Sequence, residues 1–382
     1  MNVDLSRRAQ QRLALTSYYA VSGLCMGSWT SRIPTIKVNF DLNEAALGNL
    51  LFIMPIASIV GIPFSSWVVA RFETRKPIAA SLLANTLTIL MLGFSDSLLM
   101  LQASVFLFAF TFRILNVAIN TQSLKIQERF ERRIIGSFHA FWSLGSLMGV
   151  GISTLMVKSS IAMGPHFMVI SLFSFIICLV GYSFLLRQDR ATKGNTFGFS
   201  RPDRFLFFLG MIILFAALLE GGMYDWSGVY FKEVLQEEVY TLGYLAFMLS
   251  MSFSRFLSDR IIDALGIFKT YLLSGSVIAV GILLAVLFPT FWIAFLGFGL
   301  VGFGTSSLFP LTFSLAGKSK KYAAGMAISI VTSYSIFGFL IGPALIGHLA
   351  HTFGLQQAFI LLACSGIMIV LISSILPKSI DG

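Results

Sequence analysis

The chain has 382 residues, of which 56% are hydrophobic and only 12% are charged. Soluble domains carry about 25% charged residues, so this composition excludes an ordinary soluble protein. Apolar stretches of roughly 20 residues, the length of a membrane-spanning helix, recur from end to end. Barrel strands would instead alternate polar and apolar residues in runs of about 10. The composition therefore predicts an all-α membrane protein.

The formal net charge of +10 lies in short basic clusters between alternate apolar stretches, at residues 7–12, 71–76, 125–133, 187–204, 260–269 and 318–321. This alternation is the positive-inside pattern, which places both termini and the long central loop in the cytoplasm. We expect a multi-pass protein of the inner (cytoplasmic) membrane. The same distribution argues against a nucleic-acid partner.

Turn and charge signals divide the chain into twelve predicted spans: 12–37, 44–70, 77–95, 99–122, 138–158, 166–186, 205–231, 241–262, 269–287, 291–316, 323–347 and 355–376. Residues 187–204 are polar, basic and rich in Gly, Ser and Thr. We expect two pseudo-symmetric six-helix bundles, at 1–186 and 205–382, joined by this cytoplasmic linker. Six plus six spans is the layout of transporters that rock two halves about a midplane site.

The first predicted span carries Trp29 and Arg32 near its outer end. Arg32 lies about 30 Å along that span, and Asp225 lies at a similar height in the seventh span, at 1.5 Å per residue. An ion pair between them would close the outer mouth between the two halves. Trp29 is a secondary candidate for lining a cavity.

The fourth predicted span places Arg113, Asn116 and Asn120 on one helix face, at i, i+3 and i+7. A guanidinium matches a carboxylate or phosphate, and amides both donate and accept, as sugar hydroxyls require. This face suits a polyhydroxylated or anionic solute. The alternative is hydrogen bonding between helices, which is common for Asn in membranes. In the fifth span, Trp142 either stacks on a substrate ring or packs.

The seventh predicted span contains two acids, Glu220 and Asp225, in the stretch LLEGGMYDWSGVYF. Charges inside a span cost from about 2.5 kcal/mol upward and usually face a cavity or a partner. Glu220 and Tyr224 share a helix face, whereas Asp225 is about 140° away unless Gly221-Gly222 bends the helix. The alternative to a functional role is a buried ion pair that fixes packing.

Glu220 lies about 22 Å from the cytoplasmic start of the seventh span, near mid-depth. Burial favours the protonated form of such a carboxyl, and a nearby Arg favours the ionised form. A group balanced in this way binds a proton in one state and releases it in another. We therefore predict that Glu220 is the proton-coupling group and also contacts the solute.

Several stretches together resemble the major facilitator superfamily over the whole chain. The cytoplasmic signature between spans 2 and 3 is degenerate in SWVVARFETRK, at 66–76. The second copy, SRFLSDRIIDALG at 254–266, keeps Arg255, Asp259 and Arg260. GSWTSRIPTIK at 27–37, residues 113–149 and YDWSGVYF at 224–231 resemble the YbjJ-like branch, near fucose permease-like members.

The resemblance implies that spans 1, 4, 7 and 10 line a central cavity and that spans 3, 6, 9 and 12 face lipid more. It also implies that Arg255, Asp259 and Arg260 stabilise the outward-facing state, which makes them gating residues. We expect a secondary active transporter for a small hydrophilic solute, coupled to protons and acting by alternating access. The alternative is an efflux pump for amphipathic drugs or metabolites.

Other classes of function lack their motifs. The spans and loops hold no clustered catalytic side chains near a membrane surface, which argues against an enzyme, and no Gly-x-x-x-x-Gly-Lys loop for ATP is present. Cys25, Cys178 and Cys364 lie far apart in apolar segments, without metal-ligand spacing. We expect a monomer in membrane lipid, with no cofactor and no metal ion.

Overall fold

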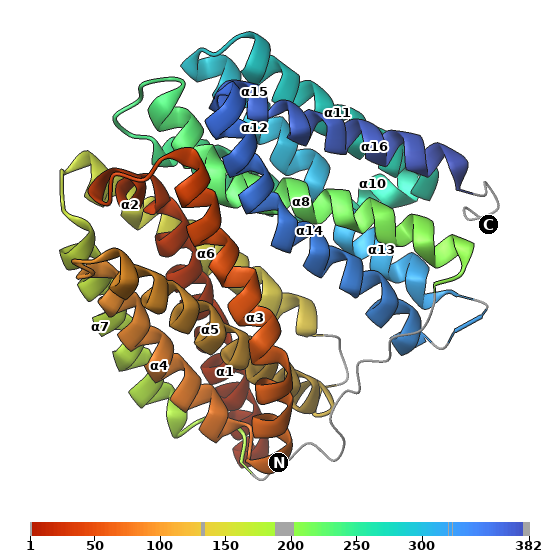
Figure 1. Cartoon of the computed structure of the whole chain (residues 1–382). Coiled ribbons are helices and arrows are strands. Elements are labelled where there is room, and N and C mark those ends of the chain that lie inside the picture. The colour runs from red at the N-terminus through yellow and green to blue at the C-terminus, as the bar shows by residue number, and fades with distance from the viewer. Residues whose placement is uncertain (1, 131–133, 188–201, 320, 323, 377–382) are drawn as a thin grey trace. The chain divides into compact units, whose positions relative to one another are not determined.

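A computed structural model of the chain describes residues 2–130, 134–187, 202–319, 321–322 and 324–376 (Figure 1). The described residues form the helices α1 to α16, and no strand occurs among them. The helices divide into two compact units. Most of the predicted linker, at 188–201, lies outside the described residues.

Unit 1 comprises Met1–Thr35 and Ile53–Thr196. Its helices are α1 (Asn2–Ser31), most of α3 (Glu44–Arg71), α4 (Arg75–Gly93), α5 (Leu98–Gln127), α6 (Ile135–Lys158) and α7 (Met163–Tyr182). Two prolines, Pro55 and Pro63, lie inside α3.

Unit 2 comprises Ile36–Phe52 and Phe197–Gly382. It therefore includes most of α2 (Ile33–Asn39) and the first turns of α3, together with α8 (Arg204–Glu233), α9 (Thr241–Arg255), α10 (Ser258–Leu265), α11 (Ile267–Leu287), α12 (Phe291–Thr305), α13 (Leu308–Gly317), α14 (Ala324–Phe353), α15 (Leu355–Ala358) and α16 (Ile360–Ile375). The sequence prediction placed residues 36–52 in the first half of the chain. In the structure their contacts group them with unit 2.

Ten helical stretches of the described residues are long and apolar enough to cross a membrane. The other two predicted spans correspond to α1 with α2 and to α9 with α10. The first is interrupted at Arg32, before Pro34, and the second at Phe256–Leu257. The tenth predicted span is likewise interrupted at Ser306–Ser307, between α12 and α13. The hydrophobic pattern predicted the spans but not these interruptions.

Glycines bring α1 and α6 into close contact within unit 1. A Cβ at Gly145 would overlap the backbone oxygen of Ala20, and one at Gly23 would overlap the backbone oxygen of Trp142. The two backbones approach too closely for any side chain at these positions. This contact fixes α1, which carries Tyr19, against the rest of unit 1.

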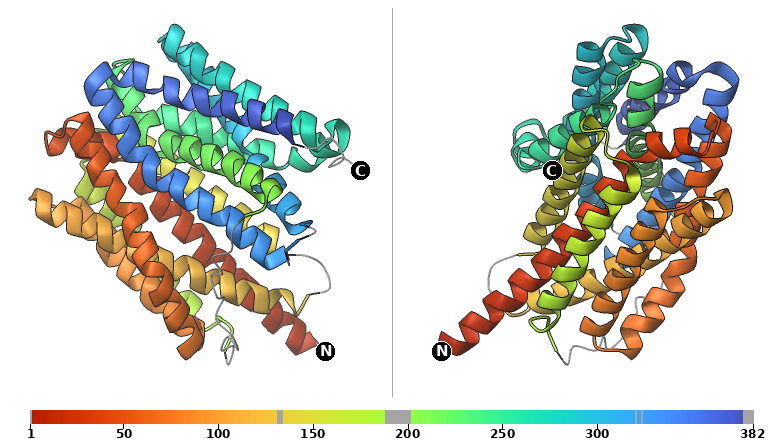
Figure 2. Two further views of the ribbon diagram at one scale, coloured as in Figure 1. Left: turned by 45° about the vertical axis from the view of Figure 1, so that its right-hand side comes forward. Right: turned by 90° about the vertical axis from the view of Figure 1, so that its left-hand side faces the viewer.

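Helix α8 is the most enclosed helix of unit 2, and it lies alongside α14 (Figures 1 and 2). Gly222 faces α14 and α16, where a Cβ would come within 2.8 Å of Ile346 and Leu362. The helix runs through Gly221 and Gly222 without interruption. These glycines therefore permit close packing, and they do not break the helix.

Candidate functional site

The polar face of α5 is joined to α1 by hydrogen bonds within unit 1. The side-chain nitrogen of Asn120 donates to the backbone oxygen of Asn116 at 2.8 Å and to its side-chain oxygen at 3.0 Å. The Tyr19 hydroxyl donates to Asn120 Oδ1 at 2.9 Å. The sequence predicted the α5 face but missed Tyr19, because apolar residues flank it and nothing in the chain order pairs α1 with α5.

Arg113 lies one turn before Asn116 on the same helix, and its side chain is half-buried. Its aliphatic stem packs where α3 has a glycine: a Cβ at Gly61 would lie 3.1 Å from Arg113 Cγ. The Nε atom is buried and has no hydrogen-bond partner in the described part of the chain. The structure thus holds a guanidinium at mid-helix whose buried Nε the described residues leave without an acceptor.

The two tryptophans predicted to line a cavity lie in different environments. Trp29 is fully buried and packs on Phe108, with ring centroids 5.9 Å apart. Trp142 is half-buried on α6. Of the two, Trp142 alone has an accessible part of its side chain.

Arg32 is buried at the break between α1 and α2. It donates from Nε to His166 Nδ1 at 3.2 Å and from Nη2 to the backbone oxygen of Ile161 at 2.8 Å. His166 Nε2 lies 3.4 Å from the Ser153 hydroxyl. Sequence reasoning missed His166, which lies 134 residues from Arg32. Asp225, the partner predicted for Arg32, belongs to unit 2, so that pair stays a prediction.

Glu220 forms the centre of a polar cluster in unit 2. The Tyr224 hydroxyl donates to Glu220 Oε1 at 2.6 Å, which agrees with their i, i+4 spacing. Arg255 Nη2 lies 3.9 Å from the same oxygen. The Tyr224 ring packs edge-on against Tyr244 and Phe247 of α9. Glu220 is only 6% exposed, so this carboxylate depends on protein partners.

Asp225 is half-buried on α8. Because α8 continues through Gly221-Gly222, Asp225 lies about 140° around the helix from Glu220. The two acids therefore do not share a face of α8. No hydrogen bond or ion pair joins Asp225 to any described residue.

The better copy of the cytoplasmic signature spans the interruption between α9 and α10. Arg255 is the last residue of α9, and Asp259 and Arg260 lie in the first turn of α10. The side chain of Asp259 is outside the described part, and that of Arg260 is exposed. Arg255 thus links the signature to Glu220, a contact that the sequence did not predict.

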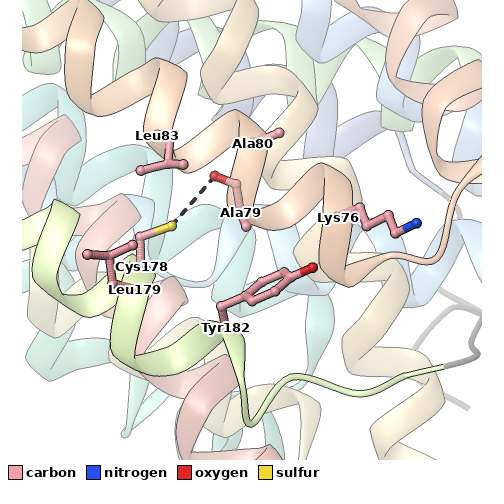
Figure 3. Close-up of a pocket in the computed structure, with 7 residues that line it drawn as sticks. All are labelled: Lys76, Ala79, Ala80, Leu83, Cys178, Leu179 and Tyr182. Atoms are coloured by element: carbon pink, nitrogen blue, oxygen red, sulfur yellow. Dashed lines mark hydrogen bonds between the residues drawn. The ribbon is translucent and has the colours of Figure 1, made fainter.

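A hollow in unit 1 lies between α4 and α7 (Figure 3). Its lining is apolar apart from Lys76 and Tyr182 near one end. The Cys178 thiol donates to the backbone oxygen of Ala79 at 3.6 Å. Such a lining offers few groups to a hydrophilic solute. Among the described residues, no group of three or more His, Cys, Asp and Glu side chains could hold a metal ion.

Comparison with known proteins identifies the family. Residues 15–320 match the family described as Major Facilitator Superfamily, which is most of the chain. The chain belongs to the major facilitator superfamily. Relatives within it include an uncharacterized MFS-type transporter of Yersinia pestis, which is 29% identical and aligns over 93% of this chain and 92% of its own length.

Two further relatives are about as distant in sequence. An uncharacterized transporter of Sinorhizobium fredii is 27% identical, over 94% of this chain and 96% of its own. The membrane protein MosC of Rhizobium meliloti is 26% identical, over 97% of this chain and 91% of its own. The chain therefore aligns with these relatives along almost its whole length.

Solved structures show the same superfamily fold. A mutant of the nucleoside transporter NupG gives a TM-score of 0.79 at 12% identity, covering 95% of this chain and 99% of that one. A bacterial homolog of the human lysosomal transporter Spinster gives 0.75 at 14% identity, covering 96% and 97%. The predicted fold class, an all-α membrane protein of the major facilitator fold, is confirmed. The chain is a multi-pass transporter of a small-molecule solute.

Proposed function

We propose that this transporter moves a small hydrophilic solute, sugar-like or an organic anion, across the inner membrane by alternating access coupled to protons. In this proposal both termini are cytoplasmic. The observation that carries it is the hydrogen-bonded polar face of Asn116, Asn120 and Tyr19 inside a bundle of membrane helices. Polar groups at such a depth usually face a water-filled path or bind a partner.

The proposed solute-binding residues are Arg113, Asn116, Asn120, Trp29 and Trp142 of unit 1 and Glu220 and Tyr224 of unit 2. Arg113 and Asn116 offer hydrogen-bond donors from unit 1. In unit 2, Glu220 and Tyr224 are held together by their 2.6 Å hydrogen bond. Asn120 positions Asn116 through its own hydrogen bonds.

Glu220 is the proton-coupling group of this proposal. Its ionised form is supported by the Tyr224 hydroxyl and by Arg255, and its burial opposes that form. A movement that separates Arg255 from Glu220 would therefore favour uptake of a proton. Asp225, which lacks a partner in the described chain, is the carboxyl to compare with it.

Two groups of residues act as gates in this proposal. Arg32 and Asp225 close the outer side, and Arg255, Asp259 and Arg260 stabilise the closed cytoplasmic side. The contact of Arg255 with Glu220 supports this assignment, since it joins the coupling carboxyl to the signature segment. The YbjJ-like branch, near fucose permease-like members, is part of the proposal and favours a sugar-like solute.

The test is uptake into proteoliposomes of a panel of sugars and organic anions, with and without an inward proton gradient. We expect saturable uptake that the gradient raises in the wild type. In Glu220→Gln, exchange of solute should continue while the gradient no longer drives accumulation. Unchanged proton coupling in Glu220→Gln, with lost coupling in Asp225→Asn, would assign the role to Asp225. Extrusion of amphipathic dyes without solute uptake would favour efflux instead.

A further inference from the structure

The orientation of the Asn120 amide is fixed by a backbone group. Its side-chain nitrogen lies 2.8 Å from the backbone oxygen of Asn116. A carbonyl oxygen only accepts hydrogen bonds, so the atom facing it must be Nδ2. The Tyr19 hydroxyl then donates to the other amide atom, Oδ1, at 2.9 Å.

The orientation of Asn116 follows from that of Asn120. Asn120 Nδ2 also lies 3.0 Å from the Asn116 side chain, and the atom that meets this donor must be Oδ1. Asn116 Nδ2 therefore points away from Asn120. No described residue accepts a hydrogen bond from it. The side-chain oxygen of Asn116 therefore accepts a hydrogen bond from Asn120, and the two N–H groups of its Nδ2 are left to bind a solute.

Arg113 adds further donors one turn away. A guanidinium carries five N–H donors and no acceptor. In the described part of the chain, its Nε is buried without a partner and no ion pair includes its side chain. The accessible face formed by Arg113 and Asn116 consequently consists of donors.

The described helices of unit 1 do not supply a counter-charge for Arg113. In its helices the only acid is Asp4, at the cytoplasmic start of α1; Glu44 of α3 belongs to unit 2. An unpaired guanidinium inside a membrane costs from about 2.5 kcal/mol upward. A ligand that brings a negative charge offsets this cost, and a neutral ligand does not.

We propose that the carried solute bears an oxyanion, a carboxylate or phosphate, and that Arg113 and Asn116 bind it. Carboxylate and phosphate oxygens only accept hydrogen bonds and match the guanidinium fork, whereas a sugar hydroxyl must also donate. This inference rests on the proposed transport of a hydrophilic solute. It selects the anionic member of the two solute classes that the sequence left open.

The experiment compares solutes that differ only by an anionic group. Purified wild-type protein in detergent is titrated with glycerol and glycerate, glucose and glucuronate, and glucose and glucose 6-phosphate. The midpoint of thermal unfolding is measured, because a ligand that binds the folded state raises it. The same solutes are then tested for uptake into proteoliposomes.

Three variants test the residues. Arg113→Gln removes the charge, and Arg113→Lys keeps the charge but not the fork. Asn116→Asp keeps the acceptor for Asn120 and replaces the free donors with an oxygen that repels an anion. Arg187→Gln and Asn39→Asp, at exposed positions, are the matched controls for charge and amide changes. Unliganded melting and size-exclusion profiles show which variants fold.

We expect an anionic member of at least one pair to raise the unfolding midpoint more than its neutral partner. Arg113→Gln and Asn116→Asp should weaken that binding by about tenfold or more, Arg113→Lys by less, and the controls not at all. Equal shifts by neutral and anionic partners, or full binding by Arg113→Gln, would overturn the inference while leaving transport intact. If no anion shifts the midpoint, the inference also fails, and if in addition no solute is taken up, the proposed function fails with it.

Discussion

Arg255 Nη2 lies 3.9 Å from Glu220 Oε1, although the sequence pattern assigns these residues to a cytoplasmic signature and to the middle of a membrane span. The relationship follows from the length of α9, which has only 15 residues and ends at Arg255. The end of α8 and the start of α9 are joined by a short loop. At 1.5 Å per residue, Glu220 lies about 20 Å before the end of α8 and Arg255 about 21 Å after the start of α9, so the two residues lie at the same depth. Arg255 of the signature therefore lies beside Glu220, the residue proposed above as the proton-coupling group.

Tyr224→Phe tests the hydrogen bond that holds Glu220. The substitution keeps the ring and removes only the hydroxyl that donates to Glu220 at 2.6 Å. Hydrogen bonds to charged groups contribute about 1.5–3 kcal/mol, so the free energy of unfolding should fall by about that amount. Thermal unfolding in detergent measures it. Tyr334→Phe is the control, because no hydrogen bond of its hydroxyl to a described residue is present; equal losses in the two variants would contradict the role of Tyr224.

Gly145→Ala tests the close approach of α1 and α6. The added methyl group would overlap the backbone oxygen of Ala20, so the helices must separate. Overpacking of this kind costs about 1–3 kcal/mol, and the unfolding midpoint should fall. Gly151→Ala, on the same helix, has open space around its added Cβ and should leave the midpoint unchanged or raise it. The prediction fails if the two alanine variants melt alike.

Lys37→Met tests the ion cluster of unit 2. Lys37 is buried, and its amine bonds Glu44 Oε1 at 2.9 Å and also Glu233 Oε1. Methionine keeps the stem and removes the amine that both carboxylates share, although His351 Nδ1 still lies 3.7 Å from Glu44 Oε2. We expect a loss of about 1–3 kcal/mol after allowance for the partial exposure of the carboxylates. The loss requires ionised carboxylates, so it should be largest at neutral pH and shrink toward about pH 4.

The control for that experiment is Lys158→Met, at the exposed end of α6. Its unfolding midpoint should match the wild type at every pH. A Lys37→Met deficit that grows on acidification would contradict the ion-cluster account, because protonation removes the repulsion between the two carboxyls.

His166→Ala tests the support of Arg32. The imidazole accepts from Arg32 Nε, and its removal leaves a buried donor unsatisfied, at a cost of about 1–3 kcal/mol. His166→Gln supplies an amide oxygen and should recover part of the stability. Equal unfolding midpoints for the alanine and glutamine variants would show that the ring contributes only by packing.

The fold could be predicted from the sequence because the features that indicate it are local in the chain. Apolar stretches of membrane length and basic clusters between them require no knowledge of contacts, and each predicted span corresponds to one helix or to two consecutive helices. The interruptions at Arg32, Phe256–Leu257 and Ser306–Ser307 were missed, since none of them changes the hydrophobic pattern enough to mark it.

The sequence could predict the candidate site only where its residues lie on a single helix. The α5 face and the Glu220–Tyr224 pair follow from helical spacing. Tyr19 and His166 contact helices that are far apart in the chain. Arg255 contacts Glu220 from the next helix along the chain. The spacing of residues within one helix has no information about pairs between helices. The sequence also left open whether Gly221-Gly222 bends the helix, because small residues occur both at kinks and at close helix contacts.

The most direct test of this account is uptake of the best-binding anion into proteoliposomes under an inward proton gradient, for wild type, Arg113→Gln and Glu220→Gln. We expect the wild type to accumulate the anion, Glu220→Gln to exchange it without accumulation, and Arg113→Gln to do neither. Accumulation by Arg113→Gln at the wild-type level would contradict the assignment of Arg113 as the residue that binds the carried anion.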